Sequence, residues 1–158
     1  MAVIPKKKAT KKAPSLPTLR AKLDRVFSEW VRRRTAGEGG TVRCVACGVL
    51  KHWKDMHAGH FVSRKSTATR YDERNVNPEC PACNTFSEDH LIGYTIWMQE
   101  NHGDMVIAEL WAKKHQPVKM TRADYESLLT TYREKLAMLN AGYIEESPTE
   151  TWVRENIG

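Results

Sequence analysis

The four cysteines of this 158-residue chain form two Cys-x-x-Cys pairs, and they restrict the fold more than any other feature of the sequence. Cys44 and Cys47 make one pair, Cys80 and Cys83 make the other, and 32 residues separate the pairs. Two such pairs supply the four thiolates of a tetrahedral zinc ion, each pair holding the ion from a tight turn. The alternative, a redox or disulfide role, is unfavourable in a reducing compartment. We therefore predict a structural Zn²⁺ with no open coordination position.

The segment between the two pairs is too long for a compact zinc ribbon, which uses about 15–20 residues there. It must leave the zinc as a loop and return, and the zinc would then fix both of its ends. The loop is rich in polar and basic side chains that a structural zinc site does not need. These are His57, His60, Arg64, Lys65, Arg70, Arg74, Asn75 and Asn77.

These polar side chains suit phosphodiester hydrolysis, which needs a base to activate water and a divalent cation to stabilise charge. A neutral histidine such as His60 suits the base, and oxygen ligands suit Mg²⁺ or Mn²⁺. Asn75, Asn84 and Glu88 supply such oxygens. If a helix begins at the second cysteine pair, Asn84 and Glu88 lie one turn apart on one face. The alternatives are a structural His60, a helix-capping Asn84 and a solvated Glu88.

The net charge of +6 is concentrated at the N-terminus. Residues 1–34 hold eleven of the 25 Lys and Arg residues but only two of the 19 Asp and Glu residues. Counterion release makes such a cluster a natural contact for nucleic-acid phosphates, although a solubilising tail has the same composition. No apolar run approaches the roughly 20 residues of a membrane helix, and no apolar signal-peptide core is present. We expect a soluble cytoplasmic protein that binds DNA and no membrane.

The fold class expected from these patterns is α+β. Apolar residues from Leu19 to Val31 recur at three- and four-residue steps and predict one helix face, while Arg32 and Arg33 belong to the opposite, basic face. Thr121 and Asp124 resemble a capping box before a C-terminal helix, and Gly142 stands where a C-cap glycine belongs. The aromatic and leucine positions of the later helices, including Trp97 and Trp111, are expected in the core. The predicted segments are a flexible basic arm (1–15), a basic amphipathic helix (16–40), a zinc-bound core with short strands (41–92), a helical segment (93–142) and a polar tail (143–158).

At His60, Asn75, Asn84 and Glu88 the sequence resembles the His-Me finger (HNH) endonucleases, whose ββα unit carries a base histidine on a hairpin and metal ligands on the following helix. The order Cys-x-x-Cys, His60, Asn75, Cys-x-x-Cys-Asn84 is similar to that of recombination endonuclease VII. The strings "FSEWVRRR", "CVACG", "HAGHFVSR" and "RYDERNVNPECPACN" resemble the phage NinG (Rap) recombination family over about residues 16–140.

The resemblance implies a zinc-stabilised ββα core with flanking helices and a structure-selective nuclease acting on branched DNA such as Holliday junctions and D-loops. It implies His60 as catalytic base, Asn75 in a supporting role, and Mg²⁺ or Mn²⁺ held by Asn84 with His57 or Glu88. It also implies a phage-encoded protein in the bacterial cytoplasm, and a homodimer would provide the two active sites that symmetric cutting requires. The expected phosphate contacts are Arg32, Arg33, Arg64, Lys65, Arg70 and Arg74.

One position departs from the HNH pattern. The residue before the base histidine is usually a metal-binding Asp or His, and here it is Gly59. On a regular strand His57 and His60 point to opposite faces, so we expect Gly59 to mark a bulge that turns both inward. Two readings from other classes remain: a non-catalytic zinc-finger DNA-binding protein such as a phage regulator, and a thiol redox protein.

Overall fold

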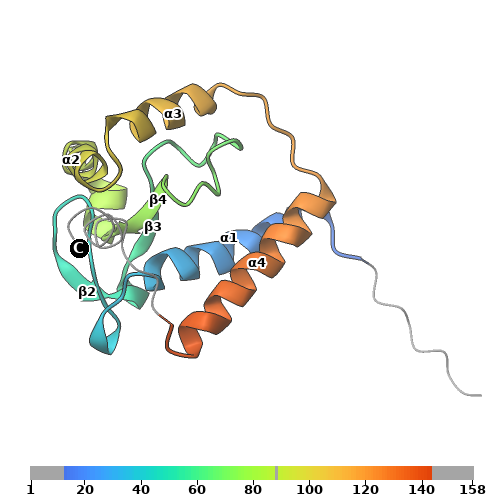
Figure 1. Cartoon of the computed structure of the whole chain (residues 1–158), viewed down its shortest axis with the longest axis horizontal. Coiled ribbons are helices and arrows are strands. Elements are labelled where there is room, and N and C mark those ends of the chain that lie inside the picture. Colours follow the sequence, from blue (N-terminus) through green and yellow to red (C-terminus); the bar gives the residue numbers. More distant parts are fainter. Residues whose placement is uncertain (1–12, 88, 144–158) are drawn as a thin grey trace, which may run out of the picture.

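The computed structural model describes residues 13–87 and 89–143, which form α-helices packed against two small antiparallel sheets (Figure 1). The predicted mixture of helices and short strands is confirmed. None of the described helices combines the length and hydropathy of a membrane span. The predicted flexible arm up to residue 12, the tail from residue 144 and Glu88 lie outside the described residues.

The N-terminal helix α1 (Leu16–Arg33) lies alongside the C-terminal helix α4 (Arg122–Asn140), and the two form the larger core (Figure 1). Ser15 begins α1 by accepting a hydrogen bond from the Thr18 backbone N–H. The predicted apolar face of α1 is confirmed, and it packs against α4 and against strand β4 (Val76–Glu79). The core residues are Leu23, Phe27, Trp30, Val31, Val76, Leu129 and Tyr132.

The start and the end of α4 follow the prediction. Thr121 and Asp124 form a complete capping box, which satisfies backbone N–H groups at the start of the helix. Gly142 follows the helix with φ of 90°, a left-handed conformation that glycine adopts without strain.

Between these helices the chain forms two short hairpin-like pairs. Strand β1 (Thr41–Arg43) pairs with β2 (Leu50–His52), and β3 (His57–His60) pairs with β4 (Val76–Glu79). Two single-turn 3₁₀ segments, Glu38–Gly40 and Trp53–Asp55, precede β1 and β3. Strands of three and four residues bury little surface, so other contacts must hold them in place.

The helix expected directly after the second cysteine pair is interrupted. A single π-helical turn η3 (Ala82–Phe86) ends when the Ser87 N–H bonds the Ala82 carbonyl, and helix α2 begins only at His90 (His90–His102). The expected continuous helix face through Asn84 is therefore wrong.

Helices α2 and α3 (Asp104–Lys114) enclose a second core against the loop after β3. Its buried residues are Val45, Phe61, Val62, Tyr94, Met98 and Leu110. The core prediction for Trp111 is wrong, because this side chain is 45% exposed and its ring lies under the Lys114 ammonium group at 4.2 Å. The Lys114 ammonium group thus covers one face of the indole ring, although the ring is not buried in the core.

Candidate metal centre and cleft

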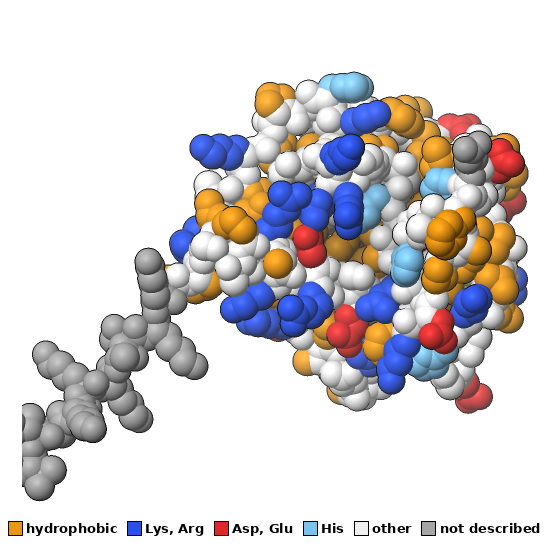
Figure 2. All heavy atoms as spheres, turned by 180° about the vertical axis from the view of Figure 1, so that it is seen from behind, with side chains coloured by type: hydrophobic (Ala, Val, Ile, Leu, Met, Phe, Trp, Pro, Cys, Tyr) orange, Lys and Arg blue, Asp and Glu red, His pale blue; other side chains and the backbone are white. Residues whose placement is uncertain are grey.

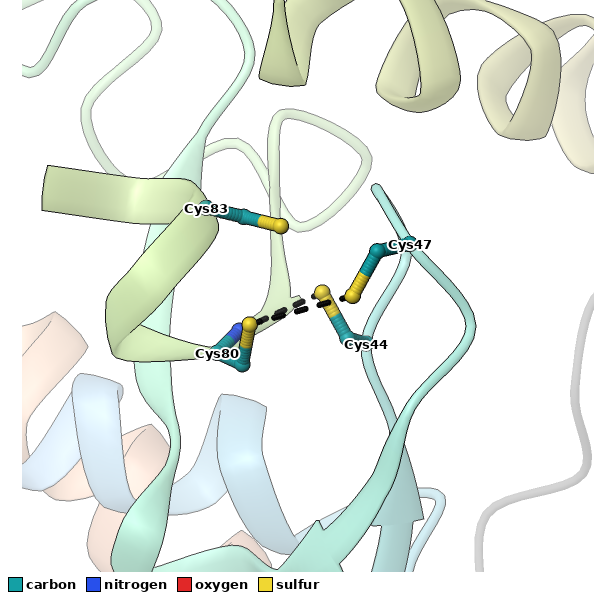
Figure 3. A group of neighbouring side chains, drawn as sticks. All are labelled: Cys44, Cys47, Cys80 and Cys83. Atoms are coloured by element: carbon teal, nitrogen blue, oxygen red, sulfur yellow. Dashed lines mark hydrogen bonds between the residues drawn. The ribbon is translucent and has the colours of Figure 1, made fainter. Parts of the chain in front are cut away.

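The four cysteine side chains converge as the spacing predicts, with their sulfurs pointing toward one another (Figure 3). Cys44 and Cys47 come from the β1–β2 turn, and Cys80 and Cys83 come from the end of β4 and from η3. All four Sγ atoms lie within 4.8 Å of one another, and those of Cys47 and Cys80 are 3.8 Å apart. A tetrahedral zinc with bonds of about 2.3 Å separates its sulfurs by roughly 3.8 Å. The donor set and its spacing therefore fit structural zinc.

Backbone amides prepare the first cysteine turn for a charged sulfur. The Cys80 N–H donates to Cys44 Sγ at 3.3 Å, and the Ala46 and Cys47 amides also act on this sulfur. Gly48 closes the turn with φ of 74°, and its N–H bonds the Cys44 carbonyl at 2.9 Å. A positive φ at this position favours glycine, which explains the residue after the second cysteine.

The surroundings of the cysteines oppose the joint ionisation of all four thiols in the absence of a cation. Burial raises the pKa of Cys44, and burial together with the neighbouring Cys47 and Cys80 raises the pKa of Cys83. Burial also acts to raise the pKa of Cys80, but the Cys83 amide and the nearby thiols outweigh it and lower that pKa. Four adjacent sulfurs ionise together only when a cation compensates their charge, as zinc does.

A cleft of about 860 Å³ lies beside the metal centre, between α1, β3, η3 and the start of α2. Figure 2 shows a face of the molecule on which lysine, arginine and histidine side chains lie around a hollow. The polar residues that line the cleft are Ser28, Arg32, Lys54, His57, His60, Ser63, Arg64, Asn84, Thr85 and His90. The cleft thus contains the predicted base His60, two of the three predicted cation ligands, His57 and Asn84, and several cationic side chains.

His60 ends β3 and is half-buried at the cleft. Its Nε2 lies 3.0 Å from the Arg70 carbonyl, an acceptor, so the neutral ring donates there and keeps its basic lone pair on Nδ1. Burial lowers the pKa of His60, and the positive charges of Arg70 and Arg64 add to this effect against the Arg70 and Ala58 carbonyls. His60 therefore stays unprotonated near neutral pH, the form in which a histidine accepts a proton.

His57 and Asn84 meet on the same wall, although 27 positions separate them in the sequence. The Asn84 amide and the His57 Nδ1 are 3.0 Å apart, and both side chains are exposed. The expected bulge at Gly59 is wrong, because β3 and β4 pair in continuous register from His57 to His60. Gly59 instead lies beneath the Glu79 side chain, where a Cβ atom would collide with it.

Asn75 supports the loop after β3 from inside the protein. Its side chain is fully buried, accepts a hydrogen bond from the Val62 N–H and donates to the Val62 and Thr69 carbonyls. All of its amide groups are used in this way, so it holds the backbone next to His60 and does not face the cleft.

The basic side chains of this region divide into two groups. Arg32 and Arg64 line the cleft, and Lys65 is exposed nearby in sequence. Arg70 is 9% exposed and binds Asp24 through two nitrogens, while Arg74 binds Asp72 and Glu109. Their guanidinium groups hold the loop onto α1 and α3.

Arg33, also expected to contact phosphate, pairs with Glu29 and donates to Asn140. The sequence interpretation did not identify Arg34, which lies at the end of α1 and bonds the Glu73 and Val76 carbonyls and the Asn77 side chain. Nothing in the sequence pattern separates this arginine from its two neighbours.

Sequence reasoning also missed two residues beside the cleft. Glu79 precedes Cys80 and is fully buried, and His90 begins α2 with 22% of its side chain exposed. Glu79 Oε1 accepts a hydrogen bond from His90 Nδ1 at 2.6 Å. The eleven-residue separation of a glutamate and a histidine gives no periodic signal by which to pair them.

Fold and site together define a small α+β protein with a four-cysteine cluster, suited to a metal ion, beside a basic, histidine-lined cleft. The chain belongs to the family described as bacteriophage lambda NinG protein, whose model matches residues 3–141. It is 24% identical over 117 residues to protein ninG of Salmonella phage P22, 23% to that of Escherichia phage 933W and 22% to that of Escherichia phage lambda. Each match covers 69% of this chain but only 56–57% of the relative. No solved structure matches the chain.

Proposed function

We propose that this chain is a metal-dependent DNA endonuclease of the His-Me finger (HNH) type that acts on branched recombination intermediates. The observation that carries the proposal is the position of His60, a histidine held unprotonated on a cleft that it shares with the His57–Asn84 pair. A histidine buried only to complete a core would not need cationic side chains and a second polar pair in the same cleft.

In the proposed reaction His60 accepts a proton from water at Nδ1 as the water oxygen attacks phosphorus. The bond from phosphorus to the leaving ester oxygen breaks, and this oxygen takes a proton from solvent. A divalent cation, Mg²⁺ or Mn²⁺, bound by Asn84 and His57 would stabilise charge on the phosphate and the leaving oxygen. The Arg70 carbonyl holds the imidazole in one orientation throughout, because it accepts the Nε2 hydrogen.

Cationic side chains support a DNA phosphate as the substrate. Arg32, Lys54 and Arg64 line the cleft, and residues 1–12 carry five further lysines. Such contacts position a duplex through its backbone and weaken as salt rises. The preference for branched DNA, and a dimer that would present two active sites to a junction, are carried by the NinG and HNH resemblance.

The proposal is tested by cleavage of a synthetic four-way junction and of a linear duplex with the same arm sequence, each with Mg²⁺ or Mn²⁺. We expect wild type to cut the junction and His60→Ala to be slower by about 10²–10⁴-fold, the usual contribution of a general base. His115→Ala is the control, because this exposed histidine lies outside the cleft lining. All three proteins must retain zinc.

Junction binding without cutting by any of the proteins would contradict the proposal and support a zinc-dependent DNA-binding protein. Equal cutting of junction and linear duplex would keep the nuclease but remove the branched substrate.

A further inference from the structure

Glu79 is the most unusual ionisable residue beside the cleft. It lies in strand β4, is 0% exposed, and only one of its carboxylate oxygens has a hydrogen-bond partner. Oε1 binds His90, while Oε2 is buried without any partner among the described residues. An unpartnered oxygen of a buried carboxylate is costly, so its retention calls for a cationic ligand or a structural reason.

The strand opposite Glu79 makes room for its carboxylate. A Cβ atom at Gly59 would lie 2.8 Å from Glu79 Cβ and would collide with Oε2, so the Glu79 side chain fills the space that a side chain at position 59 would occupy. Glycine is required at position 59 by space and not by backbone strain. Its φ is ordinary, and the obstacle to a Cβ atom is the Glu79 side chain itself.

Two other donors flank this carboxylate. His57 stands directly opposite Glu79 in the β3–β4 register, and its ring contacts Asn84. His90 holds Glu79 through Nδ1, so its Nε2 is the ring nitrogen left for a ligand. His57, Asn84 and His90 all line the cleft.

We propose that Glu79 and His90 belong to the divalent-cation site of this cleft, together with His57 and Asn84. A histidine that donates one ring nitrogen to a carboxylate and offers the other to a metal is a recurrent arrangement in metal sites, and the carboxylate fixes the ring and strengthens its donor atom. The inference deepens the proposed function, since it assigns the remaining ligands of the cation that the nuclease would use.

The four side chains do not yet converge to bonding distance. Among the described residues, the cysteines are the one group of three or more His, Cys, Asp or Glu side chains whose ligand atoms lie within 4.8 Å of one another. Convergence would come from rotation of the exposed His57 and Asn84 side chains and of the partly exposed His90 toward the buried Glu79 carboxylate. Imidazole nitrogens in this set favour Mn²⁺ over Mg²⁺, whose preferred ligands are oxygens.

The test measures Mn²⁺ binding to the zinc-loaded full chain without DNA, from the electron paramagnetic resonance signal of free Mn²⁺. Wild type is expected to bind one Mn²⁺ per chain. Glu79→Gln keeps a partner for His90 but removes the charge, and His57→Ala changes an exposed ligand without disturbing the core. Each should weaken binding at least tenfold, the usual effect of losing a ligand or its supporting carboxylate. His115→Ala should bind as wild type does.

Wild-type affinity in Glu79→Gln would overturn the inference, and a lowered melting temperature of this variant would then identify the Glu79–His90 pair as purely structural. The absence of Mn²⁺ binding by wild type would also overturn it. Failure of the nuclease proposal is distinguishable from failure of this inference. Mn²⁺ binding by these residues without junction cleavage would contradict the nuclease and support the cation site. Junction cleavage with unaltered Mn²⁺ binding in the variants would support the nuclease and contradict the cation site.

Discussion

Different forces stabilise the two ends of this protein, the end around the four cysteines and the end formed by helices α1 and α4. Around the cysteines, strands of three or four residues surround a small cluster of Val42, Met56 and the cysteines themselves. At the other end, α1 and α4 bury a continuous aromatic and leucine core. Short strands with little apolar area cannot fix their own positions, so we expect a bound zinc to supply the stability that packing supplies between the helices.

The cleft lies where these two regions meet. Helix α1 contributes Ser28 and Arg32, β3 contributes His57 and His60, and the segment after Cys83 contributes Asn84. Because these side chains come from both regions, a destabilising substitution at either end should change the geometry of the cleft. Substitutions at the two ends should differ, however, in whether the protein loses zinc.

The largest effect is expected from Cys80→Ser. Structural zinc contributes on the order of 10 kcal/mol in small zinc domains, comparable with the whole stability of a typical protein. We expect zinc content to fall from one ion per chain to nearly none, and the region around both hairpins to unfold while the α1–α4 helical signal partly persists. Elemental analysis and far- and near-ultraviolet circular dichroism measure these changes. A zinc-free Cys80→Ser protein with wild-type spectra would refute the comparison.

Leu23→Ala tests the helical end. Leu23 is fully buried between α1 and α4, and truncation of a buried leucine costs about 2–5 kcal/mol. Urea unfolding should show this loss while the zinc content of the folded protein stays at one ion per chain. Exposed Leu16→Ala is the matched control and should change stability by less than about 0.5 kcal/mol. Loss of zinc in folded Leu23→Ala would mean that the two regions are not separate.

Asn75→Ala should have an intermediate effect. The side chain makes three buried hydrogen bonds to the backbone of the loop beside His60, and each backbone group left without a partner costs about 1–3 kcal/mol. We expect a lower free energy of unfolding with zinc retained and with faster amide exchange in residues 61–75. Asn84→Ala is the control, because this exposed amide supports no backbone group in the hydrogen bonds of the structure. Equal exchange in both variants would show that Asn75 does not hold the loop.

Features set by local, repeated residue patterns are predicted correctly from the sequence, and features set by contacts between distant segments are not. Periodicity correctly predicts the buried face of α1, and cysteine spacing correctly predicts that the four sulfurs converge, because both depend on residues whose pattern is local and repeated. The placement of His60 and the His57–Asn84 pair at one cleft follows from the order of motifs. The role of Arg70 depends on Asp24, and that of Arg74 depends partly on Glu109; both acids come from distant elements and leave no trace in spacing. The Arg74–Asp72 pair, in contrast, lies within two residues of the loop. For Gly59 the deciding contact is across the sheet to Glu79, and strand alternation alone suggested a bulge instead.

The smallest expected effect concerns protons at His102, at the end of α2. Burial lowers the pKa of His102, and the charges of Arg34 and Arg74 lower it further. Its Nε2 is buried without a hydrogen-bond partner among the described residues. As pH falls through about 6.5, the ordinary histidine value, the unfolded chain binds a proton that the folded chain resists, so stability decreases toward low pH.

Removing this histidine should therefore flatten the loss of stability between pH 7.5 and 5.5. One proton limits the change in slope to about 1.4 kcal/mol per pH unit. Urea unfolding of wild type and His102→Asn at several pH values, with zinc content measured at each, gives the comparison. A zinc-bound cysteine cluster is also expected to lose stability in acid, because its thiolates take up protons, but that loss is common to both proteins. Equal slopes would mean that the charged form of His102 is tolerated in the folded protein, and that acid sensitivity comes from the cysteine end and the remaining titratable groups.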